Sequence, residues 1–431
     1  MEKTPIETHR QTLDLSALAL RLCGCWDYQS TQFSLRVVNF LSRMFNWIIV
    51  MTIVITMSAD AIINFRDLEA VTNDAGFIFP ILTILTKAIR LHSRRKQINQ
   101  LINAVHNPIE KLRYSSDVGV LTVIRTAISY QNFDFCFFSI MLGSVFCIIF
   151  AITSDSEQLA LRGYYFCNET VSPGYEIAFF LQLYTIFMCC LWVVIIDTTM
   201  LGLIRWINLQ LYIIRYNYKN CKHDKIDRAD FSMTREAYEV IKNYNYFKVT
   251  DDQTKIRLFI PFDMSEVNIK IDSFTIRFKL CIKHYQKLTK NINDFNEIFS
   301  SILFIQIFLV IFFTCLCLFQ AVLTMNQKAK FIKYIFLLGA ELVHLFYYCF
   351  FGNELINQGE AIVDSIWNSG WVDHMSPEIK DLMINALLQT TKPTVINAGY
   401  FFTLSVKTFL SIIQKSYSYF AILITMMNGS N

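Results

Sequence analysis

The feature that most constrains this chain is a series of seven apolar stretches, each about as long as a membrane-spanning helix. The hydrocarbon core of a bilayer is about 30 Å thick, and a helix crosses it with roughly 20 residues. Because lipid cannot hydrogen-bond the backbone, such segments are expected to be helices rather than open strands. The stretches, which we call spans one to seven, are residues 44–63, 75–92, 134–153, 178–203, 299–325, 331–352 and 397–426. The sequence therefore predicts an all-α membrane protein with seven transmembrane helices.

The composition agrees with this fold class. Charged residues make up 17% of the 431 residues and hydrophobic residues 54%, whereas soluble domains are about 25% charged. A formal net charge of +4 is too small to indicate nucleic-acid binding. The 12 cysteines lie mostly inside the spans and form no disulfide framework, so reduced thiols are expected.

The charges of the loops predict an orientation. The segment between spans two and three carries six basic residues: Arg94, Arg95, Lys96, Lys111, Arg113 and Arg125. The flanking loops on the other side carry only Arg66 and Arg162. The positive-inside rule then puts the N-terminus in the cytoplasm and the C-terminus outside. Asn168, in the sequon Asn168-Glu169-Thr170, would lie outside and could accept a glycan.

These observations divide the chain into segments. The expected order is a cytoplasmic N-terminal segment (1–38), spans one to six (39–352) with a long cytoplasmic loop (204–298), a second cytoplasmic segment (353–396), span seven (397–426) and an extracellular tail (427–431). The N-terminal segment has no short apolar core with a cleavage site, so span one is expected to serve as its own insertion signal.

Few residues inside the spans suggest chemistry. Glu341 and His344 are three residues apart on one face of span six, a spacing that di-metal bundles use. Those bundles also need a second such pair and two further carboxylates, which are lacking, so an intramembrane hydrogen-bonding pair is the favoured interpretation. Asp197 in span four must face protein or water, because a charge at mid-membrane is costly. With no phosphate loop or nucleophile elbow, the sequence indicates no enzyme, no metal site and no cofactor.

Span seven carries a polar stripe. With successive residues about 100° apart, one face holds Tyr400, Leu404, Lys407, Ser411, Gln414, Ser418, Ile422 and Thr425. The opposite face holds Phe402, Phe409, Ile413 and Phe420. Polar residues at membrane depth need internal partners or water. The stripe is therefore either a helix–helix contact held by hydroxyls or the lining of an aqueous pore, and the helix alone does not decide between them.

The last hundred residues contain short motifs in a fixed order. FYYCFFGNEL (346–355) ends span six and AIVDSIWNSGW (361–371) follows it. Lys392-Pro393, Asn397-Ala398-Gly399 and TLSV (403–406) then lead to SYSYF (416–420). Upstream, SPGYEI (172–177) precedes span four and IRFKLCIKHYQKL (276–288) precedes span five. In these motifs the chain resembles insect odorant receptors, most clearly over 276–426 and weakly before 130 and across 219–275.

The resemblance implies a function and partners. Members of the family have seven spans, a cytoplasmic N-terminus and an extracellular C-terminus, and they lie in the cell membrane of sensory neuron dendrites. They are odorant-gated, non-selective cation channels in which a tuning subunit and a shared co-receptor (Orco) form a heterotetramer. The chain departs from the co-receptor's C-terminus, so it resembles a tuning subunit. Segments 276–298 and 353–396 would belong to the cytoplasmic anchor where subunits meet.

The resemblance also implies roles for residues in span seven. This span lines the family's pore, which would place Ile422 at a hydrophobic gate with Thr425 just outside it. Ser418, Gln414 and Ser411 would continue the pore lining. Lys407 and Lys415 do not fit this simply, because fixed positive charge opposes conduction in a cation pore.

Odorants bind members of this family among the outer halves of spans two, three, four and six. The side chains there that would contact a volatile ligand are Phe79, Phe138, Met141, Ser144, Tyr184, Met188 and Tyr334. An ordinary bundle core is the alternative interpretation for each of them. With so few polar groups, we expect weak binding in which shape rather than hydrogen bonding sets the preference.

Two rival receptor classes remain for comparison. A gustatory receptor-type ligand-gated channel would share the topology and the pore, but its usual Thr-Tyr and Gln-Phe pairs are absent from span seven. A G-protein-coupled receptor would have its N-terminus outside, and it would usually show an Asn-Pro-x-x-Tyr run, whereas span seven has no proline. A transporter would be expected to show interrupted helices and an internal repeat.

Overall fold

The computed structural model describes residues 33–154, 159–165, 171–222, 228–245, 248–267, 269 and 273–429. Asn168, the segment 1–32 and the last two residues lie outside this part of the chain. Among the described residues, six helices are long and apolar enough to cross a membrane. They are α2 (Phe33–Ile63), α3 (Leu68–Ser93), α5 (Val118–Ser154), α6 (Gly174–Asn220), α10 (Phe274–Leu323) and α11 (Lys328–Trp367). These six helices occupy the predicted spans one to six.

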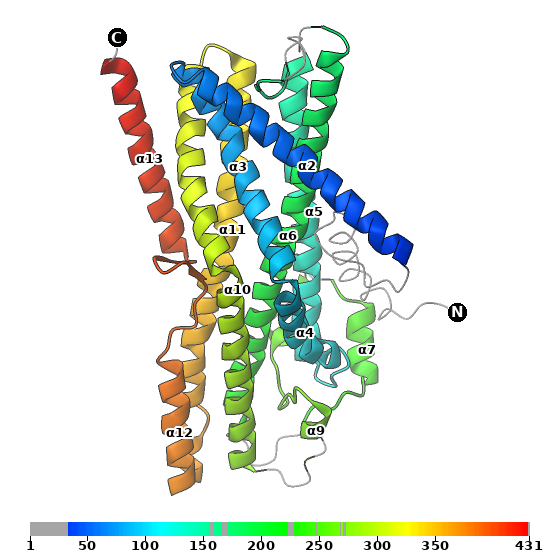
Figure 1. Ribbon diagram of the computed structural model, residues 1–431. Coiled ribbons are helices and arrows are strands. Elements are labelled where there is room, and N and C mark those ends of the chain that lie inside the picture. Colours follow the sequence, from blue (N-terminus) through cyan, green and yellow to red (C-terminus); the bar gives the residue numbers. More distant parts are fainter. Residues whose placement is uncertain are drawn as a thin grey trace.

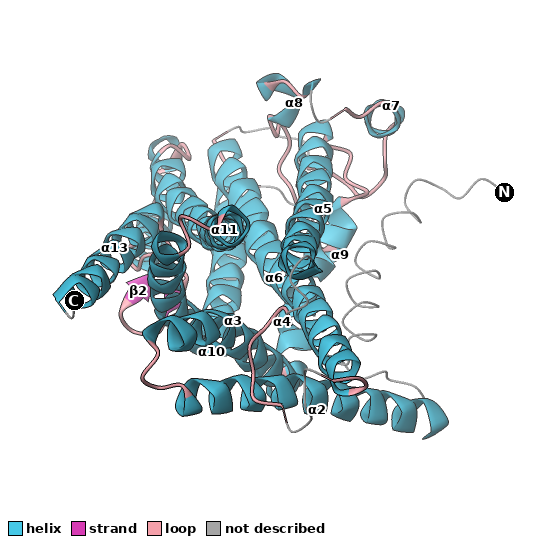
Figure 2. Ribbon diagram, turned by 90° about the horizontal axis from the view of Figure 1, so that it is seen from above, coloured by secondary structure: helices cyan, strands magenta, loops and turns pink. Residues whose placement is uncertain are grey.

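The last long helix, α13 (Val406–Gly429), occupies most of the predicted span seven. It lies at the edge of the bundle, beside α10 and α11 (Figure 1). α2 runs along another edge, as the view from above shows (Figure 2). The helical membrane fold predicted from the apolar windows is confirmed.

Three of the helices are much longer than a bilayer requires. α6 has 47 residues, α10 has 50 and α11 has 40, and at 1.5 Å per residue each spans 60 Å or more. Their lower halves form a second layer together with α4 (Arg95–Leu112) and α12 (Pro377–Thr390) (Figure 1). The short helices α7 (Arg235–Lys242), α8 (Asp251–Thr254) and α9 (Met264–Val267) lie between α6 and α10 in the sequence. A 3-10 turn, η2 (Trp371–His374), joins α11 to α12. The region expected to be a long loop, 204–298, is therefore largely helical.

Polar side chains fix where several of these helices begin. The Asp67 carboxylate accepts hydrogen bonds from the backbone N–H groups of Glu69 and Ala70 at the start of α3. Ser273 caps α10 in the same way, and Ser376 caps α12 ahead of Pro377. Such caps satisfy N–H groups that have no partner within the helix.

The segment before α10, in which the family resemblance is weak, is hydrogen-bonded to the lower layer. The Asn217 side-chain amide donates to the Ile260 carbonyl and accepts from the Ile260 N–H, both at 2.8 Å. One carboxylate oxygen of Asp117 accepts from the N–H groups of Arg257 and Leu258, each at 3.0 Å. Both anchoring side chains are buried, so the segment is folded onto α5 and α6.

A small hairpin precedes α13. Strands β1 (Asn397–Ala398) and β2 (Phe402–Thr403) pair antiparallel, and Gly399 takes a positive φ of 65° in the turn. The Gly399 N–H donates to the Ser300 carbonyl at 2.9 Å, and Asn296 accepts from the Asn397 N–H at 2.9 Å. Because of this hairpin, the helix expected from residue 397 begins at Val406. Tyr400 and Leu404, assigned to a helical stripe, lie before it.

Gly352 lets α11 approach the chain beyond this hairpin. A Cβ atom at Gly352 would lie 2.4 Å from the Leu404 carbonyl oxygen. Gly352→Ala should therefore force the two segments apart and lower the free energy of unfolding by about 1–3 kcal/mol, the usual cost of overpacking. Thermal unfolding of detergent-solubilised protein would measure it.

Gly339 on the same helix is the matched control, because a Cβ atom there would meet nothing within 4 Å. Gly339→Ala should leave stability unchanged or raise it slightly, since Ala favours helix. Equal destabilisation by the two variants would show that close approach at Gly352 is unimportant.

Candidate functional site

A cavity lies inside the upper half of the bundle. Its volume is about 150 Å³. An engineered cavity of about this size lined by Leu, Ile and Phe binds benzene, so there is room for a small organic molecule. The lining comes from α3, α5, α6, α10 and α11, which are spans two to six, and from one loop residue, Leu161.

Most of the cavity wall is apolar. The apolar residues come from all five helices: Phe77, Pro80, Ile81, Ile84, Met141, Leu142, Val145, Ile149, Ile186, Val193, Phe313, Leu337 and Ala340. Polar side chains are few, and three of them can carry charge: Lys87 on α3 and Glu341 and His344 on α11. A mostly apolar cavity with a few convergent polar groups is the usual form of a small-molecule site.

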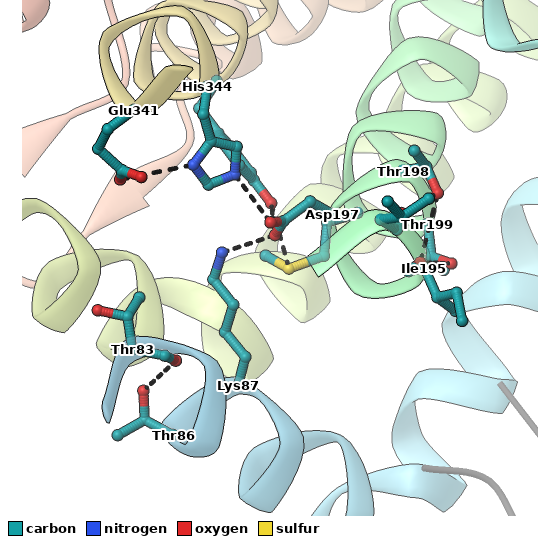
Figure 3. Close-up of polar contacts among 12 residues, drawn as sticks. Thr83, Thr86, Lys87, Ile195, Asp197, Thr198, Thr199, Glu341 and His344 are labelled. Atoms are coloured by element: carbon teal, nitrogen blue, oxygen red, sulfur yellow. Dashed lines mark hydrogen bonds and ion pairs between the residues drawn. The ribbon is translucent and has the colours of Figure 1, made fainter. Parts of the chain in front are cut away.

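Behind these charged side chains lies a buried network centred on Asp197 of α6. The Lys87 ammonium is 2.6 Å from Asp197 Oδ1, and the side chains are 2% and 0% exposed. Tyr348 donates its hydroxyl hydrogen to the same oxygen at 2.6 Å. His344 Nε2 lies 2.8 Å from Asp197 Oδ2. One carboxylate therefore joins α3, α6 and α11, as Figure 3 shows for Lys87 and His344.

His344 connects this network to Glu341. Its second ring nitrogen, Nδ1, is 3.6 Å from Glu341 Oε1 (Figure 3). Both nitrogens of the ring thus face carboxylate oxygens. The pairing of Glu341 with His344 expected from their spacing is present, but it is the looser contact of the two. Among the described residues, no group of three or more metal-ligating side chains is close enough to hold a metal ion.

The network brings together Lys87 of span two, Asp197 of span four, and Glu341 and His344 of span six. Asp197 was expected to be a buried packing partner, and it has 0% exposure. Its main partner, Lys87, lies 110 residues earlier in the chain, so no local pattern in the sequence connects the two. The signal that could have paired them is charge balance, since opposite charges inside a membrane tend to face one another.

The seven residues proposed from the sequence as ligand contacts are spread more widely than the cavity. Met141 is part of the lining. Phe138 lies next to it, with its ring 6.0 Å from that of His344. Phe79, Ser144, Tyr184, Met188 and Tyr334 are outside the lining; Tyr184 hydrogen-bonds Asn46 and Tyr334 hydrogen-bonds Asn73. Whether any of the seven contacts a ligand stays a prediction.

The polar stripe on α13 points away from the bundle. Lys407, Gln414, Ser418, Ile422 and Thr425 are exposed, and Ser411 is half-buried. The opposite side of α13 packs on α10 and α11 through residues that include the buried Ile412 and Ser416. Within this chain the stripe therefore does not serve as a helix–helix contact.

The two lysines of α13 behave differently. The Lys415 ammonium lies over the Phe402 ring, 5.1 Å from its centroid, so the side chain turns toward the hairpin and away from the stripe. Such a cation–π contact is worth about 0.5–1 kcal/mol at an exposed site. Lys407 is exposed at the start of the helix.

Comparison with known proteins identifies the family. Residues 67–417 match the family model described as 7tm odorant receptor. The chain belongs to the odorant receptor family. The match covers most of the chain, including the cavity, the Asp197 network and the first half of α13. This odorant receptor is thus a multi-pass membrane protein, as the apolar spans predicted.

Individual relatives agree with this assignment. Odorant receptor Or2 of Anopheles gambiae is 27% identical over 153 residues, which are 35% of this chain and 39% of that receptor. The odorant receptor coreceptor of Drosophila melanogaster is 30% identical over 89 residues, 21% of this chain and 18% of the coreceptor. These matches span well under two thirds of the relatives' lengths.

The fold matches a solved structure over almost its whole length. The olfactory receptor OR5 of Machilis hrabei, in complex with eugenol, superposes with a TM-score of 0.76, covering 98% of this chain and 99% of that one. The sequence identity is 11%, so this likeness concerns the fold alone.

Proposed function

We propose that this odorant receptor is a tuning subunit that binds a small volatile molecule in the cavity and gates a non-selective cation channel together with the co-receptor. The observation that carries the proposal is the combination of two features in one family member. One is a mostly apolar cavity among α3, α5, α6, α10 and α11. The other is a helix, α13, whose polar side is left exposed by its own chain.

The exposed stripe supports a pore shared between subunits. A polar helix face at membrane depth needs water or polar partners, and the described part of this chain buries the opposite face instead. In a heterotetramer the stripe would face the central axis, with Ser411, Gln414 and Ser418 lining the path and Ile422 and Thr425 at its outer end. The Lys415 side chain turns toward Phe402, so one of the two positive charges that oppose a cation pathway is directed away from the stripe.

Aromatic contacts connect the cavity to α13. Phe313 lines the cavity, and the neighbouring residue Phe312 stacks on Tyr419 of α13 with ring centroids 5.9 Å apart. On α11, Phe346 lies two residues beyond His344. Its ring packs edge-on against that of Phe409 of α13, with the ring centroids 5.4 Å apart. A ligand that changes the packing of α10 or α11 would thereby bias α13. Gating requires that it bind the open state more tightly than the closed one.

The family match favours this function over the gustatory receptor-type channel. A pore role for α13 would serve both classes, but residues 67–417 match the odorant receptor model. The resemblance of a short stretch to the coreceptor supports a shared architecture between the two kinds of subunit.

The proposal is tested by recording from cells that express the chain with and without the co-receptor. A panel of volatile ligands should evoke cation current only when both subunits are present. Cells with the co-receptor alone are the control, because they report currents that do not depend on this chain. Robust ligand-evoked current from this chain alone would contradict its role as a tuning subunit.

A further inference from the structure

The cavity has one polar wall in an otherwise apolar lining. We use this name for Lys87, Glu341 and His344, which all line the cavity. Glu341 lies near the middle of the apolar stretch 331–352, where an unpaired charge is costly. A cavity that only selected its ligand by shape would not need ionisable groups at this depth.

Two of the three side chains in the polar wall are already engaged. The Lys87 ammonium is 2.6 Å from Asp197 Oδ1, and His344 Nε2 is 2.8 Å from Asp197 Oδ2. Their side chains are 2% and 8% exposed. The Lys87 ammonium and His344 Nε2 are therefore directed at Asp197, and His344 Nδ1 faces Glu341, so the polar atoms of both side chains face carboxylates rather than a molecule in the cavity.

Glu341 is different. Among the described residues, its charged contact is His344 Nδ1 at 3.6 Å, which is longer than a hydrogen bond. The Glu341 side chain is 23% exposed, the most accessible of the three. An ionised carboxylate is purely a hydrogen-bond acceptor with two oxygens, so a group that donates hydrogen bonds would complement it.

The net charge of the cluster also favours a ligand that donates hydrogen bonds. The four ionisable groups are Lys87, Asp197, Glu341 and His344, so the cluster contains two carboxylates and one lysine. With a neutral imidazole the cluster has one excess negative charge, and with a charged imidazole it is balanced. In neither state does it hold an excess positive charge that would attract an anionic ligand.

We propose, on the basis of the proposed receptor function, that the cavity takes a small molecule with an apolar body and a hydrogen-bond-donating head, an alcohol or an amine. The body fills the apolar part of the cavity, whose volume of about 150 Å³ suits a single ring. The head donates to the Glu341 carboxylate. This assigns Glu341 as a specificity-determining residue and replaces the expectation that shape alone sets the preference.

The test uses four ligands with one carbon skeleton: toluene, benzyl methyl ether, benzyl alcohol and benzylamine. Current is recorded from cells carrying this receptor and the co-receptor, and the half-maximal concentration of each ligand is compared between wild type and Glu341→Leu. This ratio cancels differences in ligand hydrophobicity. We expect it to rise at least about 10-fold for the alcohol and the amine, because hydrogen bonds to charged groups strengthen binding by roughly 10- to 150-fold. Toluene and the ether should keep ratios near one.

A second variant separates charge from hydrogen bonding. Glu341→Gln keeps the shape and a carbonyl acceptor but removes the charge, so it should weaken the response to benzylamine more than the response to benzyl alcohol. The matched control is Glu176→Gln, an exposed glutamate at the start of α6 that lies outside both the cavity lining and segment 353–396, and it should change nothing. Unaltered toluene responses in both Glu341 variants show that they fold and reach the surface.

The outcomes distinguish the ligand class from the function. Current evoked equally by all four ligands, with no effect of Glu341→Leu, would overturn the inference that the ligand donates a hydrogen bond to Glu341. It would leave the receptor function standing. A larger loss for the ether than for the alcohol would also overturn the inference. No current from any of the four, in cells with both subunits in which another volatile of the panel does evoke current, would overturn the ligand class and leave the receptor function standing.

Discussion

Replacing Asp197 by Leu should lower the free energy of unfolding of this receptor by about 3–5 kcal/mol, which is the usual cost of removing one partner of a buried ion pair. The substitution leaves the Lys87 ammonium, 2% exposed, without a counter-charge in the middle of the bundle. It also removes the acceptor of Tyr348 and the Asp197 contact of His344. Thermal unfolding in detergent and the amount of protein at the cell surface would both report the loss.

The double variant Lys87→Met with Asp197→Leu tests whether the loss of stability comes from breaking the ion pair between these two residues. Replacing a whole buried ion pair by apolar residues is often neutral or stabilising, so the second substitution should recover most of the loss. Asp364→Asn, at an exposed position of α11, should change stability by no more than about 0.5 kcal/mol. If Lys87→Met failed to rescue Asp197→Leu, the main contribution of Asp197 would lie with His344 and Tyr348 instead.

Replacing Ile422 by Ala should raise the resting current of the assembled channel severalfold. Ile422 is 55% exposed in the single chain and follows Ser418 by one turn on the polar stripe. Hydrophobic constrictions close pores by excluding water, and a smaller side chain widens such a constriction. The measurement is whole-cell current without ligand, normalised to surface expression, together with the relative permeability of small cations.

Ile424→Ala is the matched control for this experiment. Ile424 lies two residues further along α13 and is half-buried, so its side chain is turned by about 200° from that of Ile422. It should affect packing without changing the resting current. An Ile422→Ala channel that stays closed at rest with unchanged permeability would move the gate to another residue.

The sequence predicted where the bundle's helices cross the membrane but not how far they continue. Its windows end close to the observed helix ends at Ile63, Ser93, Ser154 and Leu323. At their other ends the helices run far beyond the windows, for example to Asn220 in α6. A hydropathy window responds to long apolar stretches, whereas these extensions contain charged and polar residues, such as Arg205 and Arg215 in α6. The hydropathy signal therefore ends before the helix does.

The details of the site depended on contacts between distant parts of the chain. Asp197 and His344 were both recognised as polar residues at membrane depth, yet the pairing of Asp197 with Lys87 was not predicted, because the two residues are 110 positions apart. The hairpin before α13 was missed because its bonds to Asn296 and Ser300 cross about 100 residues. Local periodicity carries no information on such pairs.

The unbroken length of α11 has a mechanical consequence. From His344, beside the cavity, the helix continues without interruption to Trp367, a distance of roughly 35 Å at 1.5 Å per residue. A straight rod of that length that pivots by about 3° at its cavity end moves by nearly 2 Å at the other. A molecule no larger than a single ring, bound in the cavity, would thus act at the pivot end of this helix, whose far end reaches η2 and α12, the segment through which neighbouring subunits are proposed to meet.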